Sequence, residues 1–85
     1  MKSMRAKMVV SSVLATEYCE ELKMNAVSKK DGYGEDGLDE DNTFAAFTPT
    51  AELKMQICNP SLKGQFKPGQ VFYVDFTEAD NVQAS

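Results

Sequence analysis

The sequence predicts an all-β domain of mostly antiparallel strands, arranged as a small barrel or a two-layer sandwich of four to six strands with a long acidic loop. Four segments alternate apolar and polar side chains with the period of two that is typical of half-buried strands. No segment repeats its apolar residues as a helix of three turns would. Because 85 residues suffice for one domain, we take residues 1–85 as a single unit whose apolar sheet faces must be covered.

The first three alternating segments are expected to be strands. Residues 4–13 and 22–27 are separated by a polar break, which predicts a hairpin with a loose connection. Residues 51–58 show the cleanest alternation in the chain, and the Asn59-Pro60 pair ends it.

The fourth strand is expected over residues 71–77, after the pair Pro68-Gly69. That pair favours a turn, because proline presets φ at the second turn position and glycine accepts a positive φ at the third. Residues 78–85 are expected to be a frayed end. One phase of each strand supplies the expected core, which consists of Ala6, Met8, Val10, Leu22, Met24, Leu53, Met55, Ile57, Phe72, Val74 and Phe76.

Residues 28–42 contain three glycines and show neither helical nor strand periodicity. They predict a long loop, and loops of this length are usually functional or mobile. Residues 43–47 are expected to form either a single helical turn, which seats Phe44 and Phe47 in the core, or a fifth strand.

The acidic residues of this loop are hard oxygen ligands of the kind that calcium prefers. Counted from Asp31, however, a calcium-binding loop needs glycine at position six and glutamate at position twelve, where Asp36 and Asn42 stand. The pattern therefore favours a solvated loop that confers solubility or meets a basic partner, and we expect no metal. The candidate partner-binding residues are the loop carboxylates and two tyrosines: Asp31, Tyr33, Glu35, Asp36, Asp39, Glu40, Asp41 and Tyr73.

Catalytic chemistry has little support in the composition. The chain has no histidine, which excludes histidine bases and catalytic triads, and its two cysteines have neither a basic partner nor a zinc ligand set. The carboxylates lie in a polar stretch where nothing would separate their pKa values. We expect no enzyme, no catalytic residue and no cofactor.

Nucleic-acid binding is not favoured either, because a net charge of −4 opposes contact with phosphates. One alternative is a small barrel that stacks single-stranded bases on Tyr73, with Lys54 and Lys63 near it. The phenylalanines are assigned to the core instead.

The cellular setting is inferred from the termini and cysteines. No apolar run is long enough to cross a membrane, and the basic start of the chain is followed by too short an apolar stretch for a signal peptide. We expect a reducing cytoplasm with both cysteines free, and a single Cys19–Cys58 disulfide is the alternative. Because so small a core gives marginal stability, self-association is expected.

Several motifs resemble a family of small, largely uncharacterised proteins of tailed bacteriophages. They are the segments 31–33 (DGY), 35–37 (EDG), 39–44 (DEDNTF), 47–49 (FTP), 59–60 (NP), 66–69 (FKPG) and 72–77 (FYVDFT). The resemblance covers residues 4–79 and implies a viral accessory protein located in the virion or the host cytoplasm. It supplies no activity and no catalytic residues.

Three functions follow as expectations. The first is a non-enzymatic virion component, of the capsid decoration or cement type, that binds other virion proteins or copies of itself. The second is an intracellular protein that sequesters a host protein or a small-molecule ligand such as a nucleotide signal. The third is the single-strand binder described above.

Overall fold

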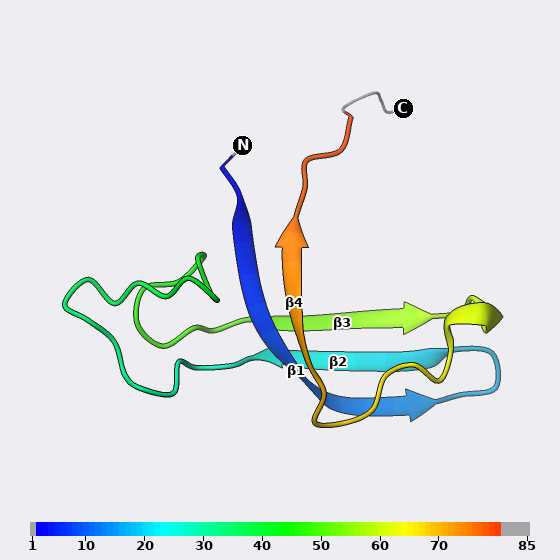
Figure 1. The fold of residues 1–85 in the computed structure, drawn as a ribbon. Coiled ribbons are helices and arrows are strands. Elements are labelled where there is room, and N and C mark those ends of the chain that lie inside the picture. Colours follow the sequence, from blue (N-terminus) through cyan, green and yellow to red (C-terminus); the bar gives the residue numbers. More distant parts are fainter. Residues whose placement is uncertain (1, 81–85) are drawn as a thin grey trace.

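The computed structural model describes residues 2–80 and consists of one antiparallel sheet (Figure 1). The strands are β1 (Met4–Ala15), β2 (Glu20–Ala26), β3 (Glu52–Ile57) and β4 (Val71–Phe76), and a 3-10 turn, η1, spans Pro60–Leu62. Their order across the sheet is β3-β2-β1-β4. The all-β prediction is confirmed, and residues 81–85 of the expected frayed end lie outside the described residues.

The sheet is open, so the expected closed barrel or two-layer sandwich is not formed. β3 and β4 lie at opposite edges and pair only with β2 and β1, respectively. β1 serves both halves of the sheet, because residues 4–9 pair with β4 and residues 8–15 pair with β2. A register shift between Val10 and Ser12 marks a bulge, which bends a strand. Figure 1 shows β1 curving so that β4 runs across the direction of β2 and β3.

The predicted register is confirmed, because none of the expected core residues is more than half exposed. Burial is nevertheless uneven across the sheet. The central strands are covered, whereas Met55 on β3 is 49% exposed, and Phe72 and Phe76 on β4 are 37% and 49% exposed. Leu53 and Val74 are half-buried. The buried core is Ala6, Met8, Val10, Leu22, Met24 and Ile57.

The hairpin of β1 and β2 ends in a tight turn rather than the loose connection expected. The Thr16 amide donates to the Cys19 carbonyl oxygen at 2.8 Å, and the Thr16 hydroxyl accepts from the Cys19 amide at 3.2 Å. This turn starts β2 at Glu20 and places Cys19 directly before it.

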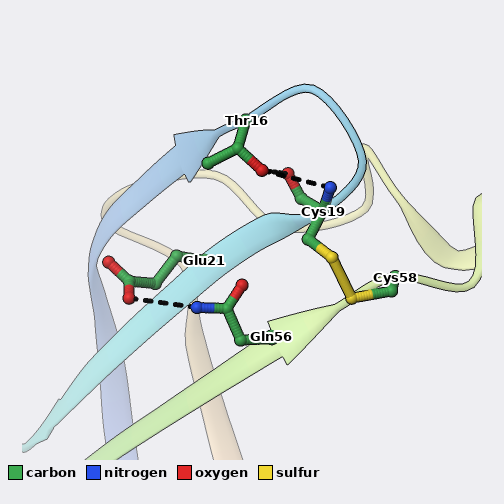
Figure 2. Close-up of a disulfide and its surroundings, with 5 residues drawn as sticks. All are labelled: Thr16, Cys19, Glu21, Gln56 and Cys58. Carbon is green, nitrogen blue, oxygen red and sulfur yellow. Dashed lines mark hydrogen bonds between the residues drawn. A yellow bond between two sulfur atoms is a disulfide. The ribbon is translucent and has the colours of Figure 1, made fainter.

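Cys19 and Cys58 form a disulfide, so the expectation that both are free is wrong (Figure 2). The register of β2 and β3 explains the pairing. Glu20 lies opposite Ile57, and the next residues outward are the two cysteines. Their Cα atoms are 4.3 Å apart, close to the spacing of about 4.5 Å between facing residues that exchange no hydrogen bonds.

The turn before β4 is confirmed in detail. The Gln70 amide donates to the Lys67 carbonyl oxygen at 3.2 Å, and Gly69 has a φ of 95°, which only glycine adopts readily. Residues 43–47 form neither the helical turn nor the fifth strand that was expected. Phe44 packs against the core, whereas Phe47 is 51% exposed because its ring turns to the loop.

The molecule is flat, with extents of 48 × 36 × 16 Å. Its radius of gyration is 15.3 Å, against about 12 Å for a compact chain of this length. Its accessible surface is 6301 Å², against roughly 5,000 Å² for a compact monomer of this mass.

Candidate partner-binding surface

The acidic loop covers an edge of β1 that β2 leaves free after Ala26. The Thr43 amide donates to the Arg5 carbonyl oxygen at 3.0 Å, and the Thr43 hydroxyl accepts from the Arg5 amide at 2.8 Å. Asn42 Oδ1 accepts from the Lys7 amide at 2.9 Å, and the Val27 amide donates to the Lys7 carbonyl oxygen at 2.9 Å. The loop thus satisfies main-chain groups that a neighbouring strand would otherwise satisfy.

Asn42 is the centre of this attachment and is only 1% exposed. Besides accepting from Lys7, its side-chain amide donates to the Val27 carbonyl oxygen at 2.9 Å and to Asp39 Oδ2 at 3.1 Å. Asp39 Oδ1 accepts from the Asp41 amide at 2.9 Å. This main-chain bond and the Asn42 amide lower the pKa of Asp39 below its ordinary value.

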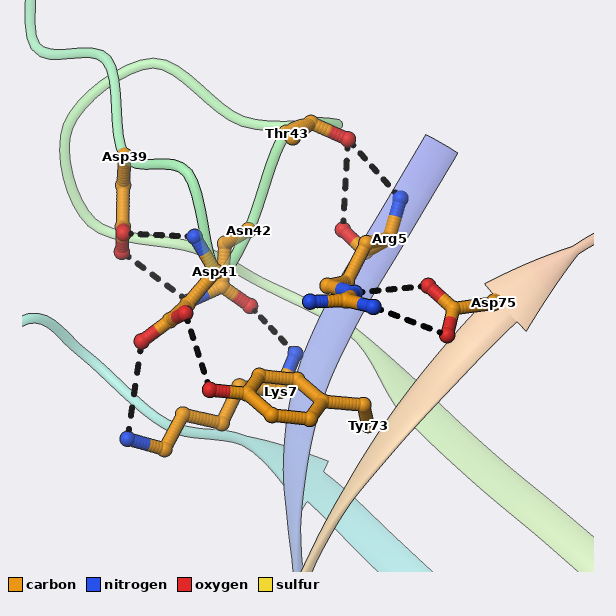
Figure 3. A network of polar contacts seen from close by, with 8 residues as sticks. All are labelled: Arg5, Lys7, Asp39, Asp41, Asn42, Thr43, Tyr73 and Asp75. Carbon is orange, nitrogen blue, oxygen red and sulfur yellow. Dashed lines mark hydrogen bonds and ion pairs between the residues drawn. The ribbon is translucent and has the colours of Figure 1, made fainter. Parts of the chain in front are cut away.

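A second group of polar contacts links the loop to β4 (Figure 3). The Tyr73 hydroxyl donates to Asp41 Oδ1 at 3.1 Å, and Lys7 Nζ lies 3.6 Å from Asp41 Oδ2. The Arg5 guanidinium lies 4.3 Å from the centre of the Tyr73 ring and contacts Asp75 at 2.7 and 3.2 Å. Its hydrogen bond lowers the pKa of Asp75. The outer face of β4 is therefore an ordered polar surface.

Tyr73 does not stand where a base-stacking platform would need it. Lys54 lies on β3, at the edge of the sheet opposite to β4, so the expected proximity to Tyr73 is wrong. One face of the tyrosine ring is also occupied by Arg5. The cause is the strand order, which alternation within single strands does not reveal.

The structure brings together three of the predicted partner-binding residues, namely Asp39, Asp41 and Tyr73. Asp39 is buried, so the interpretation of the loop as a purely solvated face is wrong at this position. Its burial follows from the hydrogen bonds with Asn42 and the Asp41 amide, which fix the loop on β1.

The remaining predicted residues lie further along the loop. Tyr33 packs edge-on against Phe47, with 6.1 Å between ring centres, and Asp36 accepts from the Leu38 amide at 3.1 Å. A side chain at Gly37 would place its Cβ 2.5 Å from the Phe47 ring, so that position is restricted to glycine. The other three carboxylates are exposed: Asp31, Glu35 and Glu40.

An open cleft of about 920 Å³ lies between the loop and β1. It is lined by side chains of both charges. The cations are Lys7, Lys29 and Lys30, and the carboxylates are Asp31, Asp39, Glu40 and Asp41. Within residues 2–80, no cluster of three or more metal-ligating side chains occurs. The same residues contain no helix long and apolar enough to cross a membrane.

Sequence reasoning missed the exposed apolar strip on β4, which consists of Phe72 and Phe76 on the apolar face, 37% and 49% exposed. Val71 and Tyr73, on the opposite face, are 49% and 51% exposed. The alternation of β4 correctly places Phe72 and Phe76 on the apolar face, but only the strand order shows that β4 is an edge strand with one neighbour. The symmetric spacing of the two phenylalanines about Val74 is the one sequence signal that could have suggested an interface.

Comparison of the chain with protein-family models, curated proteins and solved structures finds no match. The functional argument therefore depends on the geometry described above.

Proposed function

We propose that this protein is a non-enzymatic structural component of a tailed-bacteriophage particle, of the decoration or cement type, that acts by self-association of its sheet. The observation that carries the proposal is the apolar strip on β4, which lies at the edge of an open sheet. A monomer of this size rarely leaves such a strip uncovered unless another molecule binds there.

The disulfide supports a virion setting over an intracellular one. Disulfides persist in oxidising surroundings, including virion surfaces, and are rare in reducing cytoplasm. Cys19–Cys58 joins the ends of two neighbouring strands in a small sheet, where a covalent link compensates for a limited core.

The polar groups support a structural role over a catalytic one. Asp39 and Asp41 are engaged in hydrogen bonds that hold the loop on β1, and Tyr73 donates to Asp41. The chain has no histidine that could act as a base beside them.

The test is mass spectrometry of purified particles of the phage that encodes the chain. We expect the protein at a fixed stoichiometry relative to the major capsid protein, with the Cys19–Cys58 peptide pair still disulfide-linked. Abundant protein in the infected-cell lysate, with none in the particles, would contradict the proposal.

The cleft between the loop and β1 favours one second candidate, the binding of a small anionic molecule such as a nucleotide. Three lysines line it beside four carboxylates, and charge-assisted hydrogen bonds to phosphate would use the lysines. This candidate predicts that nucleotides raise the melting temperature of the purified protein, since a ligand that binds only the folded state stabilises it. The virion proposal predicts no such rise.

A further inference from the structure

The outer edge of β4 exposes main-chain hydrogen-bonding groups whose positions follow from the loop contacts. Arg5 and Lys7 direct their main-chain groups to the loop and thus away from β4. In an antiparallel pair, two facing residues either exchange two main-chain hydrogen bonds, or the N–H and C=O groups of both residues point away from the partner strand. Tyr73 and Asp75, which face Lys7 and Arg5, therefore direct their N–H and C=O groups away from β1.

We propose that a second copy of this chain pairs with β4 in an antiparallel, two-fold symmetric arrangement centred on Val74, which joins two sheets into one continuous sheet. The inference rests on the proposed function for its biological role and names the surface and the partner. β4 is the last strand in the described sheet order and pairs only with β1, so its outer edge is open to such a partner.

The sequence of β4 is self-complementary about Val74. Phe72 and Phe76 are each two residues from it and share its face. A two-fold axis at Val74 sets Phe72 opposite Phe76 of the second copy on both sides of the axis. Facing aromatic side chains on neighbouring strands stabilise pairing, and a two-fold interface uses the same patch on both molecules.

The main-chain groups agree with the same register. Centring on Val74 places Tyr73 opposite Asp75 of the second copy, and these are the residues whose N–H and C=O groups point outward. A register shifted by one residue would set a residue whose main-chain groups point outward opposite one whose groups point toward β1, and these hydrogen bonds would be lost.

Charge also agrees with this register on the polar face. The Arg5 guanidinium lies over the Tyr73 ring, 4.3 Å from its centre. Asp75 of the second copy would lie across from Tyr73 and thus beside this cation. Arg5 would then lie between two carboxylates, namely Asp75 of its own chain and Asp75 of the second copy.

The opposite edge of the sheet does not offer the same surface. The Ala26 amide donates to the Ala51 carbonyl oxygen, so the outward groups of β3 belong to alternate residues beginning at Glu52. These residues carry polar or charged side chains, and the Lys54 side chain is 63% exposed. An exposed lysine on an edge strand opposes pairing with another sheet.

The partner is assigned as a second copy rather than an unrelated strand, because the phenylalanine spacing, the outward main-chain groups and the charges of β4 are all self-complementary about Val74. A two-fold interface uses the same patch on both molecules.

Sedimentation equilibrium of the parent and two matched variants tests the assignment. Phe76 and Met55 are both 49% exposed on the apolar face, at opposite edges of the sheet. We expect a parent dimer, a dissociation constant at least about tenfold weaker for Phe76→Lys, and an unchanged dimer for Met55→Lys. A monomeric parent, or equal weakening by both variants, would overturn the proposal.

The register has its own test in a mixture of Phe76→Lys and Phe72→Glu. Each variant alone is expected to dimerise at least about tenfold more weakly than the parent, whereas the mixture restores a heterodimer in which the new charges face each other. Circular dichroism verifies that the sheet is retained, and the reciprocal pair Phe76→Glu and Phe72→Lys replaces these two variants if it is not. Failure of the folded mixture to associate contradicts the register.

The outcome is separable from that of the proposed function. A protein that is monomeric in solution yet stoichiometric in purified particles overturns this interface and leaves its place in the particle standing, with another virion protein as the partner. A protein that dimerises, responds to the variants as expected and is absent from particles supports this interface and contradicts the virion role.

Discussion

The two ends of the sheet are secured by different physical means. At the β2–β3 end, a disulfide joins the strands and charged side chains occupy the outer edge. At the β1–β4 end, buried polar side chains of the loop hold one edge of β1, and β4 leaves its own outer edge uncovered, with two exposed phenylalanines on its apolar face. The comparison teaches that this small protein closes one end of its sheet covalently and leaves the other for a partner.

The largest expected effect concerns the loop attachment at the β1–β4 end. Asn42→Ala leaves the Lys7 amide, the Val27 carbonyl oxygen and the Asp39 carboxylate without their partner. A buried group left unpaired costs about 1–3 kcal/mol, so we expect a loss of about 3–5 kcal/mol in the free energy of unfolding. Urea denaturation measures it, with the exposed Thr50→Ala as the control. A loss below that of the control would contradict the role assigned to Asn42.

The disulfide is expected to contribute slightly less at the opposite end. Cys19 and Cys58 are 39 residues apart, and a loop of that length gives a stabilisation of about 3–4 kcal/mol. The double variant Cys19→Ser, Cys58→Ser should lose this amount in urea denaturation. It should still dimerise at concentrations where it is folded, because the bond is remote from β4. Loss of dimerisation in the folded variant would show that the two ends are not independent.

The pH dependence should separate the ends further. The folded state lowers the pKa of Asp39 from an unfolded value of 3.8, so its contribution is complete above that pH and is lost as the pH falls through the folded value. We expect the melting temperature of the parent to decrease at pH values below about 4. Asp39→Asn should melt a few degrees lower at neutral pH and show a flatter acid limb. An unchanged acid limb would rule out Asp39 as a contributor, and Glu40→Gln is the control at neutral pH.

The smallest effect on stability is expected at the edge of β3. Lys54→Val removes an exposed charge whose carboxylate partner, Glu21, lies 3.9 Å away. Such surface changes usually alter stability by less than about 0.5 kcal/mol. The variant should nevertheless form larger assemblies than the parent dimer in light scattering, because the lysine blocks that edge. Unaltered particle size would show that another feature protects β3.

The sequence predicted what depends on local pattern. Alternation identified all four strands and their faces, and the Pro68-Gly69 chemistry identified the turn before β4. It could not predict which strands lie at the edges, because alternation reports faces and not neighbours. Free cysteines were the main expectation and the disulfide only the alternative. The disulfide follows from the register of β2 and β3, which pairs residues far apart in the chain.

The candidate site was predicted only in part for the same reason. The acidic composition drew attention to the loop, but Asn42 acts on Lys7, 35 residues earlier, and Tyr73 reaches Asp41 from β4. Such contacts join segments that are far apart in the chain, and composition does not report which segments lie together. The exposed strip on β4 likewise became visible only with the strand order.

Amide hydrogen exchange as a function of protein concentration tests the central claim most directly, because it needs no variant. The amides of Tyr73 and Asp75 point outward on β4, and those of Lys54 and Gln56 point outward on β3. We expect the β4 amides to gain protection as the concentration rises, whereas the β3 amides exchange at a constant rate. Equal, concentration-independent exchange at both edges would contradict the account of β4 as the open edge of the sheet.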